Sequence, residues 1–219
     1  MISRTRLIAA AGLAVLAGAL AGCKTKGEIV VDQGVGIASV RGACPSVGVP
    51  DYTGDITLFR TPDARDAASL DVTAALTNLR STCNDSSEKV YTSVSFDVLA
   101  RRTDARGART VELPYFVTVM RGGNAVISKR VGTVTLNFAD GQERAQGSAQ
   151  GGAYIDKSEA TLPYEIRQRI VRKRKAGDSD AAIDPLAQPE VKAAVARATF
   201  DVLVGFQLDD KQLAYNATR

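Results

Sequence analysis

The stretch TFDVLVGFQL, residues 199–208, has the most regular alternation of apolar and polar residues in the chain. Its apolar members occupy every second position: Phe200, Val202, Val204, Phe206 and Leu208. Successive side chains of a β-strand point to opposite faces, so this spacing predicts a strand with one buried face. We expect this strand to be the last one of the fold.

The same period of two recurs upstream, in segments 55–58, 70–77, 93–100, 111–119 and 133–138, and weakly over 142–154. Turn residues separate several of these segments, notably Arg121-Gly122-Gly123-Asn124 and Asp140-Gly141. Alternation with one polar face favours antiparallel sheets. Pro114 lacks a backbone donor, which predicts that its strand lies at an edge of a sheet or carries a bulge.

The pattern changes after Tyr154, where helical signals replace alternation. Pro163 can open a helix that runs through Lys175 and ends at Gly177, and a second helix is expected over 189–197 after a loop over 178–188. We therefore predict a mainly β fold: an antiparallel β-sandwich with a short helical insertion, about 162–198, before the last strand. The strand count and spacing resemble the immunoglobulin and fibronectin type III architecture, although the chain has no tryptophan.

The N-terminus carries an export pattern. Arg4 and Arg6 precede an uncharged run over 7–20, and small residues then lead to Cys23. The sequence Leu20-Ala21-Gly22-Cys23 resembles the lipobox of bacterial lipoproteins. That resemblance implies cleavage of a signal peptide over 1–22, acylation of Cys23, and a lipidated tether over 23–49 before a domain over 50–219. Lys24, rather than an aspartate, follows the cysteine, so we expect the outer membrane, with the domain facing the periplasm.

Two further cysteines, Cys44 and Cys83, remain after the lipobox. Export places them in an oxidising compartment, where an even number of thiols usually pairs, so we predict a Cys44–Cys83 disulfide. The chain contains no histidine, and two cysteines do not make a convincing zinc site. We therefore predict no metal and no cofactor.

A dense run of basic residues lies in the first predicted helix: Arg167, Arg169, Arg172, Lys173, Arg174 and Lys175. One interpretation is a contact for an anionic partner, such as phospholipid headgroups, an acidic glycan or an acidic protein face. The other is an ordinary solvated helix face. Asp178, Asp180 and Asp184 lack the order of a calcium loop, and we expect them to neutralise the basic run in part.

Motifs of chemistry are few. Ser86 and Lys89 have an S-x-x-K spacing, but they lie in a predicted turn and the elements that accompany this motif in serine enzymes are missing. The formal charge of +4 falls to +2 without the two arginines of the signal peptide, which gives no reason to expect nucleic acid as a partner.

We therefore predict a non-enzymatic outer-membrane lipoprotein that acts as an interaction module in the bacterial envelope. The alternatives are a lipoprotein that binds a small ligand or glycan, and a hydrolase that works without histidine.

Overall fold

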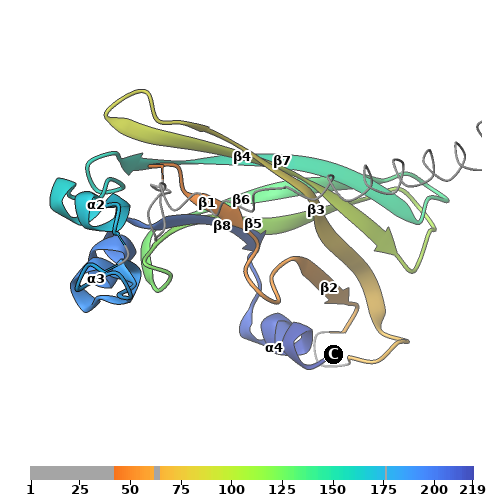
Figure 1. Ribbon diagram of the computed structural model, residues 1–219. Helices are drawn as coiled ribbons and strands as arrows, with labels where there is room; N and C mark the ends of the chain where they lie inside the picture. The colour runs from red at the N-terminus through yellow and green to blue at the C-terminus, as the bar shows by residue number, and fades with distance from the viewer. Residues whose placement is uncertain (1–41, 62–64, 176) are drawn as a thin grey trace, which may run out of the picture. The chain divides into compact units, whose positions relative to one another are not determined.

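The computed structural model describes residues 42–61, 65–175 and 177–219, and within them two four-stranded sheets face one another (Figure 1). The first sheet contains, in spatial order, β1 (Ser46–Gly48), β8 (Phe200–Phe206), β5 (Arg109–Arg121) and β6 (Ala125–Phe138). The second contains β2 (Asp55–Phe59), β3 (Leu70–Asn84), β4 (Lys89–Arg102) and β7 (Arg144–Asp156). The predicted β-sandwich with helices before its last strand is confirmed.

Most strand pairs are antiparallel, and β3–β4 and β5–β6 are long hairpins. Residues Gly122 and Gly123 have φ values of 62° and 77° in the turn between β5 and β6, as their sequence predicts. The exception is β1, which pairs in parallel with β8. The predicted tether over 23–49 was therefore too long, because its last residues already belong to a sheet.

The core lies between the two inner faces. Its most buried members come from both sheets: Val90, Val94 and Val98 from β4, Leu136 from β6, and Val202, Val204 and Phe206 from β8. Full burial of one such side chain contributes about 1.5–3 kcal/mol. The alternation in residues 199–208 thus fills the core as predicted.

Strand β3 is about twice as long as the predicted segment over 70–77. Its register shifts between Thr77 and Arg80, so that Asn78 and Leu79 lie opposite a single residue of β4. Asn78 has a φ of 52°, and its side chain donates to the Asp97 carboxylate at 2.7 Å. This bulge reverses the alternation, which is why period counting ended the strand too early.

Strand β5 is an interior strand, so the predicted edge position is wrong; its pairing with β6 does shift register, but at Val119/Met120, away from Pro114. The ladder between β5 and β8 begins one residue later, at Tyr115 opposite Phe206. The Pro114 carbonyl accepts from the Gln207 N–H at 2.9 Å. The missing donor of Pro114 therefore falls just beyond the ladder and interrupts no pairing.

Three helical pieces form the insertion: α2 (Tyr164–Val171), the 3-10 turn η2 (Pro185–Ala187) and α3 (Pro189–Ala198). Ile166 and Ile170 of α2 pack with Val191 and Ala194 of α3 in a small core of their own. The first helix was predicted to continue through Lys175, but it ends at Val171. Residues 173–181 do not belong to the compact unit that contains the two sheets.

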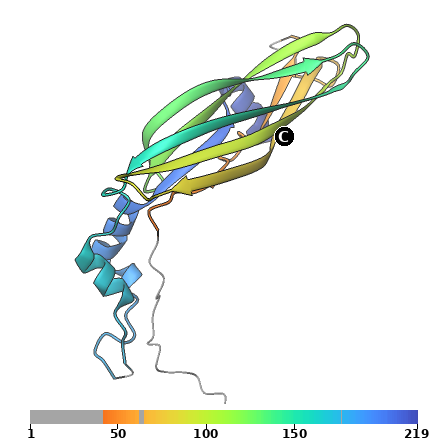
Figure 2. The ribbon, with the colours of Figure 1, turned by 90° about the horizontal axis from the view of Figure 1, so that it is seen from above.

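A last helix, α4 (Asp210–Thr218), follows β8 and was not predicted. Asp209 and Gln212 form a capping box at its start, a signal that is readable in the sequence. Few apolar side chains line one face of this helix. Its buried residue is Asn216, whose side chain donates to the carbonyl oxygens of Tyr52 and Asp55 at 2.8 Å each. Figure 2 views the same fold from above.

Candidate functional site

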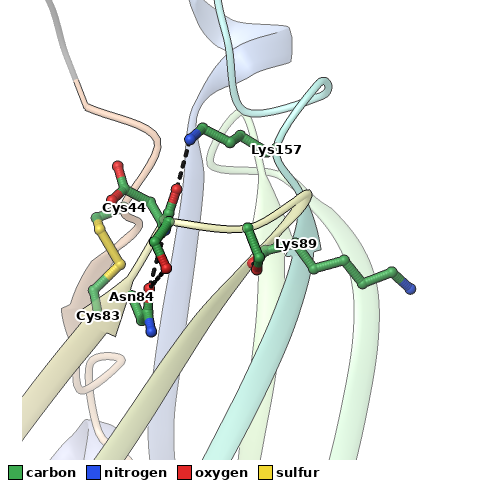
Figure 3. The surroundings of a disulfide bond; sticks show 8 residues. Cys44, Cys83, Asn84, Lys89 and Lys157 are labelled. Carbon is green, nitrogen blue, oxygen red and sulfur yellow. Dashed lines mark hydrogen bonds between the residues drawn. A yellow bond between two sulfur atoms is a disulfide. The ribbon is translucent and has the colours of Figure 1, made fainter.

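The disulfide between Cys44 and Cys83 is confirmed, with an S–S distance of 1.99 Å and Cα atoms 6.0 Å apart (Figure 3). Cys44 precedes β1 in the first sheet, and Cys83 lies near the end of β3 in the second. The bond therefore links the two sheets where the chain enters the sandwich. The predicted lipidation site Cys23 lies outside the described residues.

The turn after Cys83 carries the S-x-x-K spacing. Ser86 donates from its hydroxyl to the Asn84 side chain at 2.6 Å, and its backbone N–H donates to the same oxygen at 3.0 Å. Lys89 lies 3.9 Å from the Asp156 carboxylate, and its side chain points away from the Cys44–Cys83 bond (Figure 3). The serine stabilises a turn, and the lysine is not placed to activate it.

The six basic residues of the predicted partner site do not share one helix face. Arg167 and Arg169 lie on α2, and Arg169 forms an ion pair with Glu190 of α3. Arg172 is exposed and caps the helix end. Because the helix stops there, Arg174 lies beyond it and does not share a helix face with Arg167.

The remaining three basic residues belong to the segment 173–181. Lys173 and Lys175 are exposed, but Arg174 is buried, and its Nε lies 3.6 Å from the Asp180 carboxylate. The Lys175 N–H donates to the Asp178 carboxylate at 3.0 Å. The expected exposure of Arg174 is therefore wrong. Of the three acids that were expected to neutralise the run, Asp180 pairs with a basic side chain, whereas Asp178 and Asp184 accept from backbone N–H groups.

An aromatic pair that the sequence analysis did not single out lies on the outer face of the second sheet. Tyr91 of β4 and Tyr154 of β7 are cross-strand neighbours, with ring centroids 4.6 Å apart. Tyr154 is 65% exposed. The Tyr91 ring covers Gly152, where an added Cβ would lie 2.6 Å from the tyrosine hydroxyl. Such cover is a common role of an aromatic residue beside a strand glycine.

A shallow depression of about 630 Å³ lies further along the same sheet and is lined in part by Asp55, Leu99, Arg101 and Gln146. Two of its charged groups already have partners: Asp55 pairs with Arg219, and Arg101 pairs with Glu143 at 2.9 Å. A carboxylate held in this way is poorly placed to act as a general base.

One sheet edge is exposed along part of its length. In the described chain, β6 pairs only with β5, and it approaches β7 where Gly147 leaves room for the Thr135 carbonyl. Closer to the β5–β6 turn, the Tyr115 ring lies against Gly132 and its hydroxyl donates to the Gln150 carbonyl at 2.8 Å. The side chain of Tyr115 therefore links β5 to β7 beside Gly132 of β6.

The open part of β6, residues 125–133, carries unusual side chains for a solvent-facing strand. Val126, Ile127 and Val131 are 62%, 53% and 60% exposed. Lys129 and Arg130 lie between them, and the Lys129 ammonium lies 4.9 Å from the centroid of the Phe116 ring. The predicted strand began only at residue 133. The apolar pair Val126-Ile127, directly after the turn, is the sequence signal for its earlier start.

Within residues 42–61, 65–175 and 177–219, no group of three or more histidine, cysteine or acidic side chains is arranged to hold a metal ion. The same residues include no helix that is long and apolar enough to cross a membrane.

Comparison with known proteins adds no relative: no family model, no curated protein and no solved structure matches the chain.

Proposed function

We propose that the protein is an exported, lipid-anchored interaction module of the bacterial cell envelope that binds another envelope component and performs no catalysis. In this proposal, residues 1–22 are a signal peptide, Cys23 carries the lipid, and the sandwich stands in the periplasm on the inner side of the outer membrane. The tether between the lipid and the sandwich ends near Cys44.

The observation that carries this proposal is the Cys44–Cys83 bond between two solvent-exposed cysteines. Disulfides of this kind persist in oxidising compartments and are rare in the cytosol. The bond therefore agrees with the export pattern at the N-terminus, with which it shares no residue. Several acyl chains on one cysteine would also make release from the membrane slow, since each buried methylene contributes about 0.8 kcal/mol.

The anchor is tested with Cys23→Ser. We expect the variant to remain unprocessed and to incorporate no labelled fatty acid. A Ser46→Ala control, at an exposed position of β1, should be processed and recovered with the outer membrane on a density gradient. Normal processing and membrane recovery of Cys23→Ser would overturn the lipid anchor. Recovery of the wild type with the inner membrane would contradict the proposed outer-membrane location but not the lipid anchor.

For the anionic contact, the proposal retains the basic residues that are not buried: Arg167, Arg169, Arg172, Lys173 and Lys175. Arg174 is left out because it is buried. Replacing Arg172, Lys173 and Lys175 with glutamine should weaken binding to anionic vesicles and reduce its dependence on salt. Unchanged binding and salt dependence would make this stretch an ordinary solvated surface.

A second candidate function, binding of a glycan, is favoured by the exposed Tyr154 ring beside Tyr91. Aromatic rings offer a large apolar face, and the neighbouring outer-face side chains Ser93, Ser95 and Gln150 supply hydrogen-bonding groups. We expect Tyr154→Ala to abolish any binding to purified cell-wall polysaccharide while Leu99→Ala leaves it unchanged. Absence of binding by the wild type would remove this candidate.

A further inference from the structure

The two sheets have four edge strands, and three of them are protected in recognisable ways. β1 has three residues and β2 has five, with a register shift at its end and α4 packed beside it. β7 has Gly147 against β6, where an added Cβ would lie 2.8 Å from the Thr135 carbonyl oxygen. Short length, irregularity and cover are the usual means by which edges avoid pairing with other chains.

The fourth edge, residues 125–133 of β6, is long, although its register with β5 shifts within it, where Val119 faces Ser128 and Met120 faces Val126. Strand β6 has 14 residues and pairs in the described chain with β5 alone. Its free side therefore presents backbone donors and acceptors to solvent. All three large aliphatic side chains that are more than half exposed among the described residues lie on this segment: Val126, Ile127 and Val131.

The charge of the segment indicates what could pair with it. Lys129 and Arg130 are the only charged residues of β6. Cations on an edge strand discourage pairing with neutral chains or with a second copy, because like charges directly opposite one another are destabilising. The same two charges favour a strand that carries acidic residues at the facing positions.

We infer that residues 125–133 form a docking edge to which an extended, acidic segment of another envelope protein adds as a fifth strand of the first sheet. Backbone hydrogen bonds to β6 would provide part of the affinity, as in other cases of strand addition. Val126, Ile127 and Val131 would lose their exposed apolar surface against the added strand. This inference rests on the proposed role as an interaction module and names the surface and the chemistry of its partner.

The test is photo-cross-linking of the full-length protein in a bacterial host, with a photoreactive amino acid placed at Val126 or Val131. Control positions are Leu99 on the outer face of the second sheet and Tyr164 on α2, which are also exposed. We expect adducts of one common mass from both β6 positions, stronger than from Leu99. Mass spectrometry of the cross-linked peptide should identify an acidic, extended segment of another protein.

The charge is tested by adding Lys129→Glu and Arg130→Glu to the cross-linking variants. Reversal of two cross-strand charge pairs should weaken the β6 adducts about tenfold, whereas Lys192→Glu on the exposed face of α3 should leave them unchanged. An intact Cys44–Cys83 bond and an unchanged circular dichroism spectrum would establish that the charge-reversed protein still folds.

Each other outcome contradicts the inference in a different way. An adduct of twice the protein's mass would identify a second copy as the occupant, and an adduct peptide without acidic residues would remove the charge argument. Adducts at Leu99 or Tyr164 alone would reject the β6 edge and leave the interaction module standing. Adducts at none of the four positions would count against both the β6 docking edge and the proposed interaction module.

Discussion

Arg102 has the largest side chain among the fully buried residues, with an exposed fraction of 1%. Its guanidinium donates to four carbonyl oxygens, those of Ala105, Gly107, Ala139 and Gln142, at 2.7–2.8 Å. It also lies 5.2 Å from the centroid of the Phe138 ring. A single side chain thus holds together the loops that follow β4 and β6.

Replacing Arg102 with methionine should lower the free energy of unfolding by about 3 kcal/mol or more, because it removes four part-buried hydrogen bonds from a charged donor, and each such bond contributes about 1.5–3 kcal/mol. The measurement is urea unfolding followed by circular dichroism. The neighbouring Arg101→Met is the matched control: its exposed pair with Glu143 should contribute no more than about 1 kcal/mol. Equal losses in the two variants would contradict the role of Arg102.

Asp71 is a second charged residue that is buried. Arg109 holds it with two hydrogen bonds of 2.7 Å, and this pairing lowers the pKa of the Asp71 carboxyl below its usual 3.8. A carboxyl with a lowered pKa binds fewer protons in the folded state. The stabilisation that Asp71 contributes is therefore fully present above about pH 4. It is lost as the pH falls below about 4 and through the lowered pKa of the folded state.

Asp71→Asn should lower the free energy of unfolding at pH 7 by about 1–2 kcal/mol and flatten its decline between about pH 5 and pH 3. Urea unfolding at a series of pH values measures both effects. Asp51→Asn, in the exposed loop before β2, is the control and should keep the wild-type decline. If the free energy of unfolding of Asp71→Asn declined with falling pH as steeply as that of the wild type, residues other than Asp71 would cause the acid sensitivity.

At the scale of elements, the approach of β6 to β7 depends on a glycine. An added Cβ at Gly147 would lie 2.8 Å from the Thr135 carbonyl oxygen and 3.0 Å from the Val134 side chain. Because a backbone atom cannot move aside as the end of a flexible side chain can, the two strands would have to separate.

Gly147→Ala should therefore lower the free energy of unfolding by about 1–3 kcal/mol, the range for an overpacked site. The expected sign is informative, because glycine-to-alanine changes at unstrained sites stabilise by about 0.4–1 kcal/mol through the unfolded chain. Thermal or urea unfolding measures the change, and Gln146→Ala on the exposed face of β7 is the control. A more stable Gly147→Ala protein would contradict the close approach.

At the scale of the whole molecule, the disulfide joins the start of the described chain to the far sheet. β1 has only three residues, paired with β8 over Ser46–Gly48, and Ala43 and Val47 pack against the core, so the Cys44–Cys83 bond reinforces a short segment. Closing a loop of this length, with 39 residues of separation, restricts the unfolded chain.

Reduction should lower the free energy of unfolding by about 3–4 kcal/mol and accelerate amide hydrogen exchange of Val47 and Gly48. Unfolding with and without reductant, together with exchange by mass spectrometry, measures the two effects. The Cys44→Ser/Cys83→Ser variant should have the same free energy of unfolding as the reduced protein, and adding reductant should not change it. An unchanged unfolding midpoint after complete reduction would contradict this role.

The sequence by itself determined most strands, the hairpin turn at Gly122-Gly123 and the pairing of Cys44 with Cys83. Alternation is set by the geometry of a single strand. Once Cys23 is set aside as the expected lipidation site, Cys44 and Cys83 have only each other as partners. The class of fold follows, because alternating strands must bury their apolar faces against one another.

The tertiary structure alone decided which residues of similar type differ in role. Arg101 and Arg102 are adjacent in sequence, yet one is exposed and the other is enclosed by carbonyl groups from two distant loops. Likewise, the exposure of Val126 and Val131 depends on which strand lies beside β6. The local sequence of β6 does not indicate whether a second strand pairs with it. Hydrogen-bond partners and sheet edges are set by contacts between segments far apart in the chain, so they appear only when the chain is folded.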